Sequence, residues 1–130
     1  MEIYRLKITF PSDAGEESWS KTIDVKETCK LYQLHNYIQK LVEFDDDHLY
    51  EFFIGKSPRK RLSEIPDNIA LNEIYPLIGL KLYYLFDFAD CWLFQIVKSR
   101  KKLYAEKGVK YPVLVESTGV NPEQYPEYEH

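Results

Sequence analysis

Two aspartates and one histidine are the side chains whose types and spacing come closest to a catalytic set. Asp87 and Asp90 lie in the short acidic segment FDFADCW, and His48 directly follows the acidic run at residues 45–47. Carboxylate oxygens and imidazole nitrogens bind divalent metal ions, and a bound metal ion can activate water for hydrolysis. One hypothesis is therefore a metal-assisted hydrolase or nuclease that uses Asp87, Asp90 and His48.

A structural role for these residues is the simpler hypothesis, and the sequence favours it. Aspartate is common in tight turns because its carboxylate accepts hydrogen bonds from nearby backbone N–H groups. His35 and His48 could each bind a metal ion or carry a proton. For His35, at the edge of an apolar stripe, we expect instead a packed ring bonded to a backbone carbonyl. We therefore expect no cofactor and no metal ion, with a divalent metal ion as the alternative.

The two cysteines give no indication of catalytic or metal-binding thiols. Cys29 and Cys91 are isolated, and no CxxC spacing occurs. Acidic neighbours disfavour a thiolate at Cys91, and no base accompanies Cys29. Two reduced thiols are typical of a cytoplasmic protein, and we expect that compartment.

Two basic clusters are candidates for contact with a polyanion. Residues 56–61, KSPRKR, contain four cations, and residues 98–110 contain six cations and one Glu. Cations neutralise phosphates, and Tyr104 or Tyr111 could stack on a base. The alternative is a solvated face, or a patch neutralised by the acidic end of the chain. The sequence favours this alternative, because the net charge is −4 and no known nucleic-acid-binding motif is present.

Alternating apolar residues predict the strands that hold these side chains in place. The strands are expected at residues 3–10, 19–25, 49–54, 80–86 and 92–98. The first two form an antiparallel hairpin, and the last two are joined by the acidic turn. Apolar residues at helical spacing predict one amphipathic helix over residues 29–43, with Thr28 as its N-cap. Residues 55–68 are expected to form a long loop.

The expected fold class is α+β, with elements in the order β-β-α-β-loop-β-β. One amphipathic helix packed across a mixed β-sheet buries the apolar faces economically, and the pattern favours a β-grasp-like roll. Residues 1–110 are expected to form a single domain. Residues 111–130 contain three prolines, four Glu and no Lys or Arg, and are expected to form an extended acidic segment packed on the domain or trailing from it.

Composition limits the class of protein. The chain has 130 residues, which fits one domain, and its 45% hydrophobic and 29% charged residues are typical of a folded soluble protein. Eleven Tyr and seven Phe favour β structure and contact surfaces. We expect no signal peptide, no membrane-spanning segment and no contact with a membrane.

Four groups of residues together resemble a known family. They are Leu34, His35, Ile38 and Gln39 on the helix; Asp47, His48, Leu49, Tyr50 and Phe52 at a strand entry; Tyr83, Phe86, Asp87, Phe88, Asp90 and Trp92 in the acidic hairpin; and Tyr111, Pro112, Pro122 and Glu123 near the end. Through them the chain resembles the plasmid-pRiA ORF-three-like proteins, bacterial and archaeal domains often found on or near mobile elements. The resemblance covers nearly the whole chain, and the hairpin motif is its most specific part.

Two residues depart from the family pattern. Ala89 stands where the family usually has Gly, so the turn need not adopt a conformation that only Gly allows. Phe94 stands where many members have His, which removes one possible ligand or proton carrier. Because the family has no settled biochemical activity, the resemblance implies a fold and a context but no reaction.

The sequence as a whole favours a non-enzymatic interaction domain linked to mobile elements, which binds a protein or nucleic-acid partner. This hypothesis rests on the high aromatic content, the separated charges and the lack of a complete catalytic set. The predicted binding surface comprises Tyr83, Asp87, Asp90, Trp92, Arg59, Lys60, Arg61, Arg100, Lys101 and Lys102.

Overall fold

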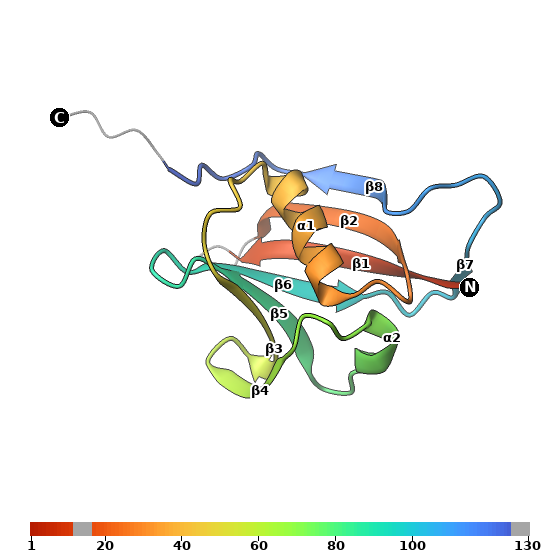
Figure 1. Ribbon diagram of the computed structural model, residues 1–130, viewed down its shortest axis with the longest axis horizontal. Helices are drawn as coiled ribbons and strands as arrows, with labels where there is room; N and C mark the ends of the chain where they lie inside the picture. The colour runs from red at the N-terminus through yellow and green to blue at the C-terminus, as the bar shows by residue number, and fades with distance from the viewer. Residues whose placement is uncertain (12–16, 126–130) are drawn as a thin grey trace.

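A single antiparallel sheet makes up most of the computed structural model (Figure 1), which describes residues 1–11 and 17–125. The strands are β1 (Glu2–Pro11), β2 (Glu17–Lys26), β3 (Tyr50–Ser57), β4 (Lys60–Ile65), β5 (Lys81–Phe86), β6 (Trp92–Lys98), β7 (Leu103–Tyr104) and β8 (Val113–Thr118). The helices are α1 (Leu31–Val42) and α2 (Leu71–Ile74). The strand order across the sheet is β4-β3-β5-β6-β1-β2-β8, and β7 pairs with the start of β1.

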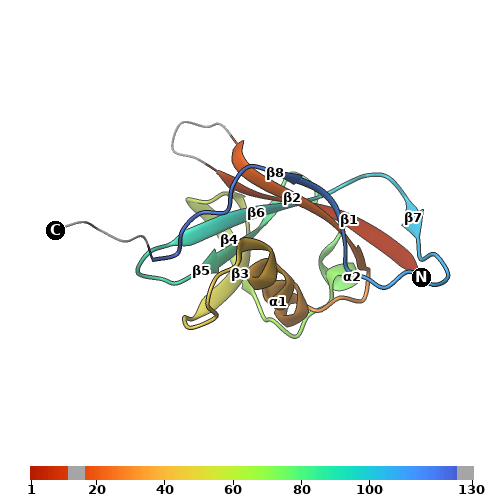
Figure 2. The same cartoon turned by 90° about the horizontal axis from the view of Figure 1, so that it is seen from above.

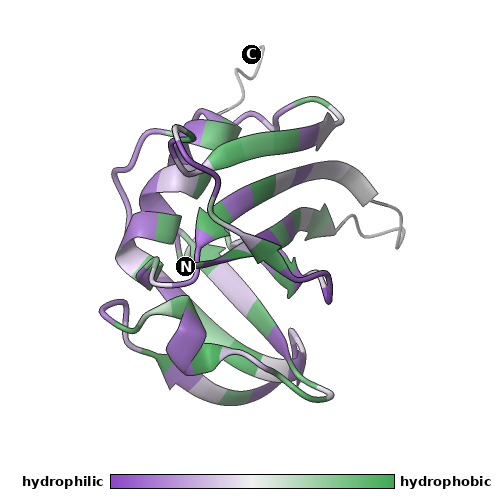
Figure 3. Cartoon of the chain, turned by 90° about the vertical axis from the view of Figure 1, so that its right-hand side faces the viewer, coloured by the Kyte–Doolittle hydropathy of each residue, from purple (hydrophilic) through white to green (hydrophobic). Residues whose placement is uncertain are grey.

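The hairpin of β1 and β2, together with β6, forms the centre of the sheet. β1 pairs antiparallel with both neighbours, so the hairpin predicted from the sequence is confirmed. Because side chains alternate between the faces of a strand, Leu6 and Ile8 are buried on one face while Arg5 and Lys7 line a groove on the other. Figure 3 shows this alternation of hydrophobic and hydrophilic residues along the strands.

The helix α1 covers one face of the sheet, as the two views in Figures 1 and 2 show. Its apolar stripe of Leu31, Leu34, Ile38 and Val42 is buried in the main core. With 12 residues α1 is too short to cross a bilayer, and no described helix is long and apolar enough to do so.

A distant segment of the chain closes the first turn of α1. The helix begins after Lys30, which has no side-chain cap of the Ser, Thr, Asn or Asp type, and not after the predicted cap Thr28. The backbone N–H of Leu31 donates to the carbonyl oxygen of Ile69 at 3.0 Å, and an isolated bridge joins Lys30 to Ala70. A cap made by residues about 40 positions away leaves no local pattern in the sequence.

The predicted fold class, α+β with a mixed sheet in a β-grasp-like roll, is wrong. Every strand pair is antiparallel, whereas a mixed sheet needs a parallel pair, and the helices have only 12 and 4 residues. The predicted loop at residues 55–68 contains β4, and the predicted extended segment after residue 110 contains β8. Both are outer strands with mostly exposed side chains, so the apolar alternation that reveals a strand is missing from their sequences.

A second, smaller apolar cluster lies on the sheet face opposite the main core. It consists of Phe53, Tyr83 and Leu85, with Leu93 packed against it. The Phe53 and Tyr83 rings stack with their centres 5.1 Å apart, and the guanidinium of Arg61 lies 4.0 Å from the centre of the Phe53 ring. An arginine side chain therefore covers apolar surface that no helix covers on this face.

The chain after residue 110 returns to the sheet edge and then to the far end of α1. β8 pairs with β2, and beyond it Asn121 Oδ1 accepts a hydrogen bond from Trp19 Nε1 at 2.7 Å. Gln124 is buried, and its Oε1 accepts from the backbone N–H of Asp45 at 2.6 Å. In Figures 1 and 2, this end of the described chain lies at the opposite end of the molecule from β7.

Candidate functional site

Asp87 fixes the turn between β5 and β6. It is only 4% exposed and has a φ of 61°, in the left-handed region that non-glycine residues rarely adopt. Its Oδ1 accepts hydrogen bonds from the backbone N–H groups of Ala89 (3.1 Å) and Asp90 (3.4 Å). The turn-fixing role considered for Asp87 is therefore confirmed, and the positive φ values of this turn occur at Asp87 and Cys91 rather than at Ala89.

His48 lies against Asp87, as the catalytic hypothesis requires for two of its three residues. The Nε2 atom of His48 is 3.4 Å from Asp87 Oδ2 and 3.5 Å from Asp47 Oδ1. The same nitrogen lies 2.6 Å from the hydroxyl of Tyr125, which donates to Asp47 Oδ2 at 2.8 Å. That hydrogen bond, more than burial, raises the pKa of Tyr125 to about 12. Protein groups therefore already surround the nitrogen that a metal or a substrate would need.

Asp90 does not join this cluster. Its backbone N–H donates to Asp87, but its exposed carboxylate makes no hydrogen bond or ion pair in the described part of the chain. Within residues 1–11 and 17–125, no group of three His, Cys, Asp or Glu side chains is placed to hold a metal ion. The structure thus brings together His48 and Asp87 but gives the three residues no shared centre.

A buried polar relay lies beneath α1, and the sequence did not predict it. Gln39 Nε2 donates to the hydroxyl of Tyr84 at 2.9 Å, and that hydroxyl lies 2.5 Å from His35 Nδ1. His35 Nε2 lies 3.0 Å from Asp46 Oδ2. If Tyr84 donates to Nδ1, the neutral ring keeps its proton on Nε2 and donates it to Asp46, so each contact has one donor. The expectation that His35 bonds to a backbone carbonyl is therefore wrong.

Burial limits what the relay can do. His35 is 3% exposed, Tyr84 is fully buried, and the ring of Tyr50 stacks on His35 with centres 3.7 Å apart. Burial also raises the pKa of Tyr84, so the phenol stays protonated. The relay fastens α1 to β5 and to the loop after α1, and only its Asp46 end, with a side chain 49% exposed, is open to solvent. One sequence signal could have found it: His35 and Gln39 are polar residues four apart beside an apolar stripe, on one side of the helix.

The two basic clusters lie far apart. Residues 59–61 form the start of β4 and the turn before it, whereas residues 100–102 lie between β6 and β7, and Figures 1 and 2 show β4 and β7 well apart. Arg61 pairs with Glu51 and stacks on Phe53. Arg100, Lys101 and Lys102 are exposed, and their side chains make no ion pair within the described residues.

The aromatic members of the predicted surface belong largely to the two cores. Tyr83 is 1% exposed in the smaller cluster. Trp92 is half-buried and packs against Phe10 and Phe44, with ring centres 5.4 Å and 5.0 Å away. The hairpin of β5 and β6 therefore exposes its turn, rather than these rings, to solvent.

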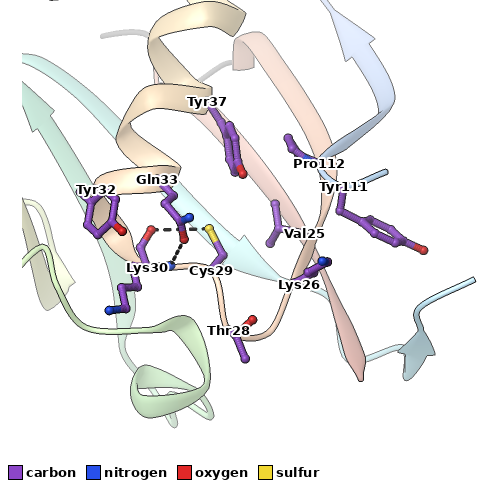
Figure 4. Close-up of a pocket in the computed structure, with 10 residues that line it drawn as sticks. All are labelled: Val25, Lys26, Thr28, Cys29, Lys30, Tyr32, Gln33, Tyr37, Tyr111 and Pro112. Atoms are coloured by element: carbon purple, nitrogen blue, oxygen red, sulfur yellow. Dashed lines mark hydrogen bonds between the residues drawn. The ribbon is translucent and has the colours of Figure 1, made fainter. Parts of the chain in front are cut away.

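A polar pocket of about 410 Å³ lies between the start of α1, the end of β2 and Pro112 (Figure 4). Its lining includes Lys26, Lys30 and Tyr37, and no carboxylate from the described part of the chain. Burial raises the pKa of the Cys29 thiol in this wall to about 12, so it is protonated and a poor nucleophile. Because the first N–H groups of α1 already have backbone partners, the pocket lacks the free donors of a helix N-terminal anion site.

The outer strands β4 and β8 leave two edges of the sheet without a described neighbour. On β4, Leu62 is 69% exposed, and the pairing with β3 shifts register twice. On β8, Leu114 is 51% exposed, and the pairing with β2 shifts once. A small apolar groove of about 140 Å³ lies beside β8, and Ile23, Tyr37, Lys40, Leu41, Pro112 and Leu114 line it.

Comparison with known proteins places the fold among relatives whose names state no activity. Residues 2–125 match the family described as Plasmid pRiA4b ORF-3-like protein. The chain is 29% identical over 128 residues to the uncharacterized protein y4hQ of Sinorhizobium fredii, covering 92% of this chain. It spans 64% of the length of that relative.

A solved structure has the same fold. The crystal structure of MM3350, a protein of unknown function from Methanosarcina mazei, superimposes with a TM-score of 0.79. The match covers 95% of this chain and 72% of that one, at 22% sequence identity. At that identity the likeness concerns the fold alone.

Proposed function

This chain belongs to the Plasmid pRiA4b ORF-3-like family, and on that premise we propose that it is a non-catalytic interaction domain that binds a protein partner along β8. The observation that carries the proposal is the open edge of β8, with an exposed leucine beside an apolar groove. An extended segment can add to such an edge through backbone hydrogen bonds, while neighbouring pockets select its side chains.

The residues of β8 suit this role. Its sequence, VLVEST, contains no Lys, Arg or Pro, the residues with which proteins commonly prevent another strand from pairing at an edge. Leu114 pairs with Ile23 in the sheet, and both residues line the groove beside α1. An added strand would therefore place alternate side chains next to Leu41 and Tyr37.

The geometry gives less support to the metal-assisted hydrolase. Asp87 is committed to its turn, and His48 Nε2 faces Tyr125 and two carboxylates of the protein. A hydrolase would need these contacts to be replaced by metal and substrate, which would remove the contact between Tyr125 and His48.

A capture experiment with two leucine variants tests the proposal. The tagged protein is incubated with lysate of its own host, and the captured proteins are quantified for the native chain, Leu114→Lys and Leu62→Lys. We expect Leu114→Lys to reduce capture of a stoichiometric partner at least tenfold, because a charge at this position opposes strand addition. Leu62→Lys makes the same change on the other edge and should leave capture unchanged.

Two outcomes would contradict the proposal. Equal capture by the native chain and Leu114→Lys would place the contact elsewhere on the molecule. Equal reduction in both variants would indicate a general effect of added charge. Circular dichroism and thermal unfolding of each variant establish that the comparison is made between folded proteins.

One observation favours a second candidate, nucleic-acid binding by residues 98–110. Arg100, Lys101 and Lys102 make no ion pair in the described part of the chain, and residues 121–125 lie at the far end of the molecule rather than on this segment. If the segment binds phosphates, changing Lys101 and Lys102 to Gln should reduce the slope of log K against log salt by about 0.7–0.9 for each phosphate that is no longer neutralised. An unchanged slope would exclude these two residues from phosphate binding.

A further inference from the structure

A groove at the end of β6 differs in chemistry from the sites described above. It lies between the loop at residues 75–81, which leads from α2 into β5, and residues 96–100 at the end of β6, and it has a volume of about 440 Å³. That volume is within the range of small-molecule sites, roughly 300–1,000 Å³. The groove lies away from β8 and does not depend on the function proposed for that edge.

Apolar side chains form much of the groove. Ile96 is buried in its wall, and Leu77 and Leu80 are half-buried along it. Ile78 also lines it and is 90% exposed, which is the highest exposure among the large hydrophobic residues of the described chain. An apolar ligand that covers this isoleucine removes apolar surface from water, which favours binding.

Every charged residue in the lining is a cation. Lys81, Lys98 and Arg100 line the groove, and no Asp or Glu among residues 1–11 and 17–125 does, although the chain carries 21 acidic residues. Lys98 Nζ donates to the carbonyl oxygen of Ser99 at 3.1 Å, and Lys81 Nζ approaches Gln95 Oε1 at 3.5 Å. Arg100 makes no ion pair in the described chain. Its guanidinium is thus available to a carboxylate or phosphate, which it can bind through two parallel hydrogen bonds.

The wall also contains a polar atom without a partner among the described residues. The hydroxyl of Tyr75 is buried and makes no hydrogen bond there, while its ring packs edge-on against Tyr4 with centres 5.9 Å apart. Burial raises the pKa of this phenol, so it stays protonated and keeps a donor. Tyr75 is also the single aromatic residue in the lining among the residues that the structure describes, so these offer little surface for stacking a nucleotide base.

We propose that this groove binds an amphiphilic anion, a ligand with an apolar chain and a terminal carboxylate or phosphate. The apolar chain covers Ile78 and lies along Leu77 and Leu80, and the anion meets the guanidinium of Arg100. This combination explains why apolar exposure and uncompensated positive charge coincide at one place in a chain that is acidic overall.

A titration monitored by NMR of the ¹⁵N-labelled chain tests the proposal with three probes. Decanoate has the tail and the charge, decanol has the tail alone, and acetate has the charge alone. We expect saturable shifts in residues 75–81 and 96–100 with decanoate below its micelle concentration, and binding at least tenfold weaker with either other probe. Equal affinity for decanoate and decanol, or shifts confined to other residues, would overturn the proposal.

Two variants identify the charge that matters. Arg100→Gln should weaken decanoate binding about tenfold, because the variant cannot form the charge-assisted hydrogen bond. Lys60→Gln removes the same charge from an exposed position on β4 and should leave the affinity unchanged. Equal weakening in both variants would show that net charge, rather than the groove, attracts the ligand.

Vesicles distinguish a free ligand from a lipid headgroup. The chain is sedimented with phosphatidylglycerol vesicles and with phosphatidylcholine vesicles. Binding of decanoate together with selective binding of phosphatidylglycerol, abolished by Arg100→Gln, assigns the groove to anionic lipid. Binding of decanoate without sedimentation assigns it to a free amphiphile. Sedimentation without decanoate binding would overturn the groove as the site, since surface charge alone would explain it.

Discussion

The two outer strands of the sheet present their free edges in different ways. β4 has two register shifts against β3, and Lys60 and Arg61 stand at its start. β8 has one shift against β2, no cation and an apolar groove beside it. Irregular pairing and Lys or Arg residues are means by which proteins prevent unwanted strand addition. By these criteria the edge of β4 is protected against strand addition, and the edge of β8 lacks the same protection.

Changing Gly55 to Ala should have the largest effect on this comparison. A Cβ at Gly55 would lie 2.6 Å from the carbonyl oxygen of Lys60 and 3.1 Å from that of Ser57, so the backbone of the β3–β4 hairpin must move. We expect the free energy of unfolding to fall by about 2 kcal/mol. Urea denaturation measures the decrease, and hydrogen exchange should accelerate in β4 but not in β8.

A second glycine separates crowding from backbone conformation. Gly108 has a φ of 84°, but a Cβ there would meet nothing within 4 Å. Gly108→Ala should therefore lower the free energy of unfolding by about 1 kcal/mol, because alanine is less stable than glycine in the left-handed conformation. Hydrogen exchange in β4 should not change. Faster exchange in β4 in both variants would show that the hairpin is not held by the close approach at Gly55.

Changing Gln124 to Ala should have an intermediate effect, on the side of β8. The amide of Gln124 accepts from the N–H of Asp45 and donates to the carbonyl oxygen of Asp45 and to Asp47 Oδ1. We expect the free energy of unfolding to fall by about 1 kcal/mol, because alanine cannot form these hydrogen bonds. Hydrogen exchange should accelerate at residues 119–125. Glu123→Ala, at the exposed neighbouring position, serves as the matched control and should change stability by less than about 0.5 kcal/mol.

Changing Arg61 to Gln should have a small effect on the edge at β4. The Arg61 side chain is 47% exposed, so its pair with Glu51 is screened by water and its position over Phe53 adds little. We expect thermal unfolding to show a destabilisation of about 0.5 kcal/mol. A destabilisation as large as that of Gly55→Ala would mean that the side chain, rather than the backbone irregularity, holds β4 in place.

Raising the pH should release the contact that Tyr125 makes with Asp47. The hydrogen bond to Asp47 raises the pKa of this phenol above its usual 10 to about 12. A raised pKa means that folding favours the protonated form of Tyr125. The hydrogen bond therefore contributes its full stabilisation below pH 10, and this stabilisation disappears as the pH passes through 12. Absorbance in the near ultraviolet should show a phenol transition near pH 12 that is missing in Tyr125→Phe. Ionisation of Tyr125 at the usual pKa of a free phenol would show that the contact does not persist in solution.

The sequence predicted the central strands well, because their side chains alternate between a buried and an exposed face. The hairpin of β1 and β2 and the strands β5 and β6 follow from that alternation. β4 and β8 did not, since a strand at an edge exposes most of its side chains and has no period-two pattern to read. The mixed-sheet topology was wrong for another reason: β1 pairs antiparallel with β6, and β3 with β5. The direction in which strands pair across such long connections leaves no local pattern in the sequence.

The candidate site was only partly predictable, for reasons of distance along the chain. The catalytic hypothesis grouped His48 with Asp87, and the structure shows their approach. The partners of His35 were not found, because Tyr84 is 49 residues away and no local pattern connects the two. The groove at residues 75–81 could not be predicted from the sequence either, since it depends on how that loop lies against the end of β6.

The position of β8 in the chain has a consequence for synthesis on the ribosome. The strands from β4 to β2 across the sheet are all complete once residue 98 has been made, but the edge of β2 has no partner until residues 113–118 follow. At roughly 5–20 residues per second, the residues between the end of β6 and the end of β8 take about 1–4 s. During that interval the backbone N–H and C=O groups on the outer side of β2 lack the partners that β8 supplies. Cotranslational contacts of this chain should therefore concentrate on β2.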